Sequence, residues 1–191
     1  IKQLGLAHLV FPGAHHTRFE HSLGVSHVGG MMADSVGLDE EEKCLVQVAG
    51  MLHDVGHGPY SHTLEHILHE NGGMDHMSVT EGIIMGDHDV LRQGEESVFA
   101  ERMLVPDILE KYDIDPKRVS DLIRGPDASG SERSLFWNEG ENNFSGEDHT
   151  LATLVHGPVD CDQTDYLLRD AHFTGVRHGI IDHRHLIHNL H

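Results

Sequence analysis

The sequence contains few cysteines and no long apolar run. Its two cysteines, Cys44 and Cys161, cannot build a disulfide framework, and neither lies in the Cys-x-x-Cys pattern of many metal sites. A reducing cytoplasm therefore fits the cysteine content best. No stretch of 18 apolar residues is present, so we expect no transmembrane helix. No signal peptide is visible from Ile1 onward.

Cationic side chains are scarce as well. Lys and Arg number 13 against 32 Asp and Glu, which gives a formal net charge of -19 at pH 7. This balance repels the phosphates of nucleic acids and of anionic membranes, and it disfavours both as partners. A solvated acidic surface, suited to a high-salt cytoplasm where charge is screened, accounts for it. Any arginine near a site would then matter more for an anionic substrate.

The length of 191 residues is enough for one domain with a buried core. Because the sequence begins at Ile1 rather than Met and stops within a helical pattern, we interpret it as part of a longer protein. Apolar residues recur at helical spacing, which predicts an all-α fold in a single domain over residues 1–191. Residues 125–148 are rich in Gly, Ser, Asn and Glu and predict a mobile loop or insertion.

A first predicted helix starts at a capping box, in which Thr17 is followed by Glu20. Phe19 and Leu23 open the apolar face that we expect for this helix. His21 lies in its first turn or two.

A second predicted helix starts with Asp39 and Glu42 and ends at Gly56. The adjacent pair His53-Asp54 lies in its expected last turn, beside a loop. Loops next to rigid helices are where reactive groups can meet a ligand. The expected core stripe of this helix consists of Leu45, Val48, Leu52 and Val55.

A third predicted helix runs from about residue 158 to residue 171, with Pro158 in the first helical position. Asp165 and Arg169 lie beside its polar face. Residues four apart share one face of a helix. That face carries Asp162, Tyr166 and Asp170.

Two imidazoles and carboxylates from these three helices can form a cage for one divalent metal ion. His21, His53 and Asp54 supply three of the donors, and the acidic cluster between Asp160 and Asp170 supplies the fourth. Such an ion can acidify water or polarise a phosphoryl oxygen. No other group of residues in the sequence offers so definite a chemistry.

Three segments in this order resemble one family. They are residues 11–25 (FPGAHHTRFEHSLGV), residues 52–62 (LHDVGHGPYSH) and residues 159–170 (VDCDQTDYLLRD). Together they resemble the HD-domain phosphohydrolases, most closely the branch of deoxynucleoside triphosphate triphosphohydrolases. The resemblance covers nearly the whole chain except residues 86–148. It implies an all-α HD-domain fold with a metal site between helices.

The resemblance implies four metal ligands, which are His21, His53, Asp54 and Asp162. Asp160 is the competing candidate for the last of them. Alignment on the segment Asp-Tyr-Leu-Leu-Arg-Asp favours Asp162, and so does its shared face with Tyr166 and Asp170. Two nitrogen and two oxygen donors suit Mn, Fe, Ni, Zn or, less well, Mg.

The resemblance also implies catalytic groups near the scissile phosphate, which are His57, His62, Glu65 and His76. His57 follows the metal-binding pair and can donate a proton to a leaving oxygen. Glu65 lies three residues after His62 and can orient its imidazole on one helix face.

Four substrate contacts are implied in the same way. Gln3, in a Gln-Leu-Gly segment, would touch the sugar, and Arg18 would reach a phosphate near the metal. Tyr166 and Asp170 would position the deoxyribose, with Asp170 accepting from its 3'-hydroxyl. One departure is Gln163, at a position where the family often has a basic residue that holds the phosphate chain.

The expected activity is hydrolysis of deoxynucleoside triphosphates to deoxynucleoside and triphosphate. One alternative is an HD phosphohydrolase acting on nucleoside monophosphates or on cyclic or signalling nucleotides. A second alternative is a catalytically weak nucleotide-binding regulator. The expected partner is a nucleotide substrate, and a homo-oligomer is compatible with the sequence.

Overall fold

A computed structural model describes residues 1–60, 70, 73–88, 103–125 and 146–190. Within these ranges every regular element is a helix, and the one ladder contact is an isolated antiparallel bridge between Lys2 and Thr17. The predicted all-α fold is confirmed. No helix in the described part of the chain combines the length and the apolar character needed to cross a membrane.

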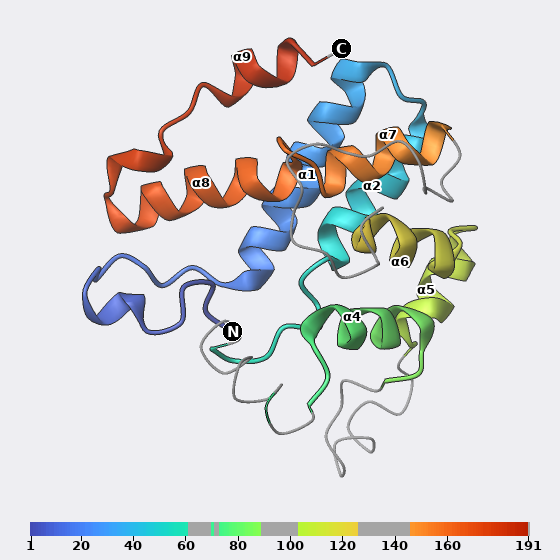
Figure 1. The fold of residues 1–191 in the computed structure, drawn as a ribbon, viewed down its shortest axis with the longest axis horizontal. Helices are drawn as coiled ribbons and strands as arrows, with labels where there is room; N and C mark the ends of the chain where they lie inside the picture. The colour runs from blue at the N-terminus through green and yellow to red at the C-terminus, as the bar shows by residue number, and fades with distance from the viewer. Residues whose placement is uncertain (61–69, 71–72, 89–102, 126–145, 191) are drawn as a thin grey trace.

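Three long helices form the centre of the molecule and carry the candidate ligands. They are α1 (Arg18–Val36), α2 (Glu40–Leu52) and α8 (Cys161–Thr174). In Figure 1, α2 and α8 both lie against α1, and α7 (Gly146–Val155) crosses beside them. The remaining helices are η1 (Ala7–Leu9), α4 (His76–Met85), α5 (Val105–Lys111), α6 (Pro116–Arg124), η2 (Arg177–Gly179) and α9 (His183–His188).

The loop or insertion predicted for residues 125–148 falls mostly outside the described residues, since 126–145 are not described. Its last part is wrong as a prediction, because residues 146–148 open α7. Gly125 ends α6 as its C-cap residue. The composition of the segment gave no sign of where the next helix begins.

The predicted start of α1 is confirmed. The backbone N–H of Thr17 donates to Glu20 Oε2 at 2.6 Å, and the N–H of Glu20 donates to Thr17 Oγ1 at 3.2 Å. These reciprocal bonds satisfy N–H groups that a helix start leaves without partners. They fix His21 in the first turn of the helix.

The predicted apolar face of α1 is wrong in its first turns. Phe19 is 71% exposed and Leu23 is 44% exposed. The buried face starts instead at Arg18 and His21 and continues, at helical spacing, through Val25, Val28 and Met32. A polar side chain thus heads the buried stripe, which a search for apolar periodicity does not detect.

The predicted capping box of Asp39 and Glu42 is confirmed at the start of α2. The helix ends earlier than expected, because its last residue is Leu52 and His53 is the C-cap residue. Asp54 lies in the turn that follows. Val55 therefore no longer follows the helical face, and it is 37% exposed rather than part of the core.

The start of α8 differs from the prediction. Pro158 is not its first residue, because the helix begins at Cys161 with Asp160 as N-cap. The Asp160 carboxylate accepts the backbone N–H of Gln163 at 2.7 Å. An aspartate that accepts this bond starts a helix more effectively than a proline without a cap, and Pro158 lies in the preceding turn.

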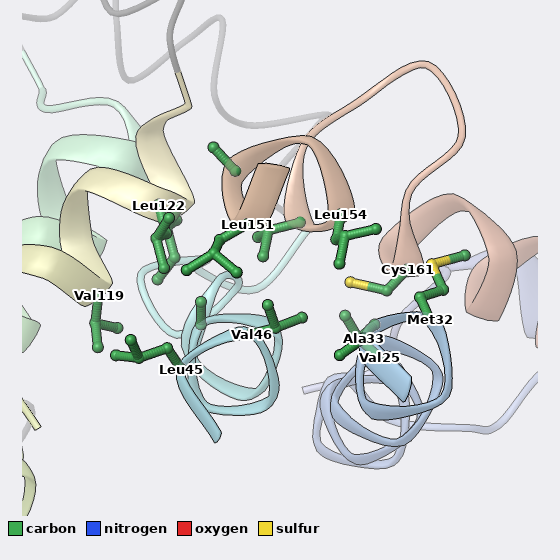
Figure 2. Packing of buried hydrophobic residues seen from close by; sticks show 14 of the residues in the cluster. Val25, Met32, Ala33, Leu45, Val46, Val119, Leu122, Leu151, Leu154 and Cys161 are labelled. Carbon is green, nitrogen blue, oxygen red and sulfur yellow. The ribbon is translucent and has the colours of Figure 1, made fainter. Parts of the chain in front are cut away.

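The hydrophobic core lies between α1, α2, α6 and α7, and α8 closes it on one side. Figure 2 shows the side chains that meet there, and they include Val25, Met32, Ala33, Leu45, Val46, Val119, Leu122, Leu151, Leu154 and Cys161. Burial of these residues fixes how the helices sit against one another. It thereby fixes the distances between the polar residues at their ends.

We expect Leu151→Ala to destabilise the protein by about 2–5 kcal/mol, since Leu151 is fully buried and its truncation leaves a cavity. The matched control is Leu9→Ala, because Leu9 is 73% exposed and should change stability by no more than about 0.5 kcal/mol. Urea unfolding followed by circular dichroism measures both. Equal losses would contradict this description of the core.

Candidate metal site and its cavity

Side chains from α1 and from the end of α2 meet in one cluster. His21, His53 and Asp54 each offer one ligand atom, and these atoms all lie within 4.8 Å of one another. Asp162, in the first turn of α8, lies against the same cluster. Its Oδ1 is 3.0 Å from His21 Nε2 and 3.6 Å from His53 Nε2. The four predicted ligands are thus brought together, and metal binding by them stays a prediction.

The donor set fits a divalent cation. His53 Nδ1 lies 2.7 Å from the backbone oxygen of Gly50, so the ring N–H donates to that carbonyl. His53 Nε2 is buried and has no hydrogen-bond partner among the described residues. A buried lone pair without a partner is costly unless something else uses it. Imidazole and carboxylate donors at this spacing suit a first-row transition metal.

The charges in the cluster also favour a cation. Burial by itself would lower the pKa of His21, but hydrogen bonds to Asp162 and Asp165 outweigh it and raise the pKa to about 9. Burial would lower the pKa of His53 as well, but the nearby carboxylates of Asp162 and Asp54 outweigh it and raise this pKa. Although burial opposes it, the two imidazoles hold the pKa of Asp162 below its ordinary value. The carboxylates therefore stabilise positive charge at this point.

Asp160 has a different role from Asp162. Its carboxylate is buried and accepts the backbone N–H of Gln163 at 2.7 Å and the side-chain amide of Gln163 at 3.0 Å. Burial raises the pKa of Asp160 to about 6, although the bonds from Gln163 oppose the shift. The amide of Gln163 also donates to the oxygen of Gly157 at 3.1 Å. Both side chains hold the start of α8, and neither lines the cavity described next.

A cavity of about 420 Å³ opens beside the cluster. This volume is within the range of small-molecule sites, roughly 300–1,000 Å³. Its lining includes the four predicted metal ligands and six other predicted site residues, which are Gln3, Arg18, His57, His76, Tyr166 and Asp170. Two further predicted catalytic residues, His62 and Glu65, lie outside the described residues.

Sequence reasoning missed five residues that line the cavity, which are Leu4, Met77, Ile123, Val155 and His156. The four apolar ones form part of its wall. In the sequence they look like ordinary core positions, because nothing in a helical pattern separates a core contact from a cavity wall. His156 sits between α7 and α8 with no motif around it.

A close contact at Gly56 positions the two histidines next to the cluster. A Cβ on Gly56 would lie 2.4 Å from the oxygen of His76 and from the nitrogen of Thr80, so only glycine fits there. Its N–H donates to Thr80 Oγ1 at 3.0 Å. The start of α4 therefore packs on the turn after Asp54. The rings of His57 and His76 stack with centroids 4.0 Å apart, and His57 Nε2 is 3.3 Å from Asp54 Oδ1.

Arg18 and Asp170 both have protein partners. The guanidinium of Arg18 donates to Asp54 Oδ2, so it is joined to the metal cluster rather than to the surface. Asp170 Oδ1 lies 2.7 Å from Nε2 of the buried His16. The ring of His16 stacks on Phe173 with centroids 4.6 Å apart. Sequence reasoning missed His16, because its neighbours in the first motif do not distinguish it from a surface histidine.

Comparison with known proteins agrees with this geometry. The family model of the HD domain matches residues 18–123, which include α1, α2 and the cluster at their ends. The chain belongs to the HD-domain family. The resemblance predicted from the three motifs is therefore confirmed. HD domains bind divalent metal ions.

Among curated proteins, the human deoxynucleoside triphosphate triphosphohydrolase SAMHD1 is 30% identical over 201 residues, covering 94% of this chain and 29% of the human protein. The uncharacterized protein YwfO of Bacillus subtilis is 34% identical over 187 residues, covering 95% of this chain and 35% of that protein. The chain thus spans about a third of the length of these relatives.

Two solved structures share the fold. A hypothetical protein from Aquifex aeolicus has a TM-score of 0.64 and 35% identity, covering 100% of this chain and 42% of that one. A phosphohydrolase from Bacteroides thetaiotaomicron has a TM-score of 0.67 and 28% identity, covering 98% of this chain and 38% of that one.

We expect Asp162→Asn to weaken binding of a divalent ion far more than Asp160→Asn. The reason is that Asp162 lies 3.0 Å from His21 Nε2, whereas Asp160 caps α8. The loss for Asp162→Asn should exceed about tenfold, the lower end of the cost of losing even an outer contact of a metal site. Isothermal titration calorimetry with Mn²⁺ measures both, and the reverse order would exclude this choice of ligand.

Proposed function

We propose that this domain hydrolyses deoxynucleoside triphosphates to deoxynucleoside and triphosphate with one divalent ion. The observation that carries the proposal is a single cavity lined by the His21, His53 and Asp54 cluster together with Arg18 and Asp170. The same cavity is thus lined by possible metal ligands, by an arginine and by a carboxylate that could accept a sugar hydroxyl. The name of the human relative, a deoxynucleoside triphosphate triphosphohydrolase, supports the same substrate class.

His21, His53, Asp54 and Asp162 would hold the ion. When bound, it would acidify water and polarise a phosphoryl oxygen. Arg18, joined to Asp54, would place its guanidinium beside the same phosphate and balance charge that develops there. Arg18 already lines the cavity.

His57 would donate the proton to the leaving oxygen. It is buried, lines the cavity and lies 3.3 Å from Asp54 Oδ1, within reach of a phosphate held at the cluster. His76 stacks on its ring and keeps it in one orientation. Donation to the 5'-oxygen of the nucleoside would favour cleavage at the α-phosphorus, with triphosphate as the second product.

Gln3, Tyr166 and Asp170 would bind the sugar. Gln3 Oε1 is buried, lines the cavity and has no hydrogen-bond partner among the described residues. A hydroxyl donor from a ligand would satisfy it. Asp170, held by His16, would accept the 3'-hydroxyl from a fixed direction.

One observation favours a second candidate, an HD phosphohydrolase acting on nucleotides with fewer phosphates. Gln163 stands where the family often has a cation, and its amide is bonded to Asp160 and Gly157. The phosphate chain therefore receives no positive charge from this position. Nucleoside monophosphates and cyclic or signalling nucleotides make smaller demands on such charge.

The two candidates are separated by incubating the protein with a panel of nucleotides and Mn²⁺ or Mg²⁺, with the products resolved by chromatography. We expect inorganic triphosphate from deoxynucleoside triphosphates. Asp54→Ala is the matched control and should abolish both metal retention and turnover while helix content stays unchanged. Release of orthophosphate from a monophosphate, with triphosphates left intact, would overturn the preferred activity.

We expect Asp170→Ala to lower kcat/KM for a deoxynucleoside triphosphate by about 10- to 150-fold. The lost bond to a charged acceptor contributes roughly 1.5–3 kcal/mol, and metal content should not change. The measurement is steady-state kinetics on matched deoxy- and 3'-deoxy substrates. Because Asp170 also holds the buried His16, circular dichroism must first confirm the native helix content. Equal discrimination between the two substrates before and after the substitution would exclude this role.

A further inference from the structure

The two ring nitrogens of His21 face different carboxylates. Nε2 lies on the side of the metal cluster, 3.0 Å from Asp162 Oδ1. Nδ1 lies 2.8 Å from Oδ2 of Asp165, one helical turn further along α8. His21 is 1% exposed and Asp165 is 6% exposed, so water does not compete for this contact. A carboxylate can only accept, and the Nδ1–H of His21 is therefore the donor.

Arg169 binds the Asp165 carboxylate through two hydrogen bonds. Its Nε donates to Oδ2 at 2.8 Å, and its Nη2 donates to Oδ1 at 2.9 Å. Two parallel bonds from one guanidinium fix the plane of a carboxylate as well as its position. Asp165 Oδ2 thus accepts from both His21 and Arg169. The three side chains form a hydrogen-bonded network that links His21 of α1 to Asp165 and Arg169 of α8.

The approach of this chain to α1 requires a residue without a side chain. Gly24 lies three residues after His21, on the same side of α1. A Cβ at Gly24 would lie 1.9 Å from Asp165 Oδ1 and 2.3 Å from Arg169 Nη2. These distances are far below contact, so any larger residue would push the Asp165–Arg169 pair away from His21.

We propose that Asp165, clamped by Arg169 and admitted by Gly24, is a positioning residue that fixes the ring of His21 with Nε2 directed at the metal. The proposal rests on the metal site of the proposed function. Metal-bound histidines commonly donate their second N–H to a carboxylate or carbonyl, which fixes the tautomer and makes the ligand more basic. The second N–H of the other histidine, His53, donates to the backbone carbonyl of Gly50. A substitution cannot remove a backbone carbonyl, so only the acceptor of His21, Asp165, can be tested in this way.

The first test compares divalent-ion affinity in the purified protein by isothermal titration calorimetry with Mn²⁺. Asp165→Asn keeps the shape but removes the negative charge, and we expect affinity to fall by about 10- to 100-fold. Gly24→Ala removes no polar group and should weaken binding in the same direction. Gly30→Ala is the matched control on α1, because the atoms nearest to its Cβ would all belong to the flexible side chain of Gln47, away from the site. It should leave the affinity unchanged.

The second test separates positioning from general structural support. In zinc-loaded protein, the Nδ1–H proton of His21 should give a downfield NMR signal that exchanges slowly with water. Asp165→Asn should move this signal upfield and speed its exchange, whereas a residue that only stabilises the fold would leave it unchanged. If Asp165→Asn fails to fold, Arg169→Gln carries the test, because it removes the clamp while Asp165 keeps its charge.

The outcomes distinguish this inference from the proposed activity. Unchanged affinity and an unchanged His21 signal in a folded Asp165→Asn protein would overturn the positioning role. Equal losses in Gly24→Ala and Gly30→Ala would overturn the role of Gly24. Weaker metal binding in Asp165→Asn, combined with a wild-type protein that hydrolyses no nucleotide, would support the positioning role and overturn the activity. Absence of divalent-ion binding in the wild type would overturn both.

Discussion

The close approach of α8 to α1 is the constraint on which the whole site depends. Gly24 permits this approach, because a Cβ there would lie 1.9 Å from Asp165 Oδ1. Because α8 runs so near, its first turn brings Asp162 against His21, and its next turn brings Asp165 against the other nitrogen of the same ring. A wider separation would leave α1 and α2 with two histidines and one carboxylate but without the fourth donor. The predicted metal site is therefore a property of helix packing as much as of the predicted ligands themselves.

This packing requires that every buried charged group has a partner of opposite charge. His21 and Asp165 are almost fully enclosed, and charged groups without partners in such surroundings cost several kcal/mol. Here each group has a partner of opposite sign, and Arg169, whose side chain is 22% exposed, completes the set. The apolar core beneath, shared by α1, α2, α6 and α7, supplies the stability that a polar cluster does not. The apolar core thus supplies stability, and the polar cluster lies outside it.

The sequence predicted the helices where local chemistry decides the structure. The capping boxes at Thr17 and Asp39 depend on residues three apart, and both are present in the structure. The prediction failed where distant packing decides. Phe19 is exposed because the buried face of α1 turns toward α2 and α8, and a single sequence does not reveal that orientation. The start of α8 differs from the prediction because Asp160, predicted only as a candidate metal ligand, accepts the backbone N–H of Gln163 and caps the helix.

The candidate site shows the same contrast between local sequence signals and contacts between distant segments. Its predicted residues came from motifs, and those that the structure describes line one cavity. His16 contacts Asp170 and Asp165 contacts His21, and these partners lie 154 and 144 residues apart in the sequence. No spacing rule links residues so far apart, so their roles emerge only when the helices are assembled.

The net charge of -19 sets a further condition on any phosphate-bearing ligand. Of the described residues that line the cavity, Arg18 is the one Lys or Arg side chain, and it is already bonded to Asp54. At long range the protein repels an anion, but this repulsion is screened beyond roughly 8 Å at physiological ionic strength. At short range a divalent ion between four ligands would be the largest positive charge in the cavity. Under the proposed function, recognition of phosphate would therefore depend on contacts made inside the site, including the geometry around His21, rather than on electrostatic attraction from a distance.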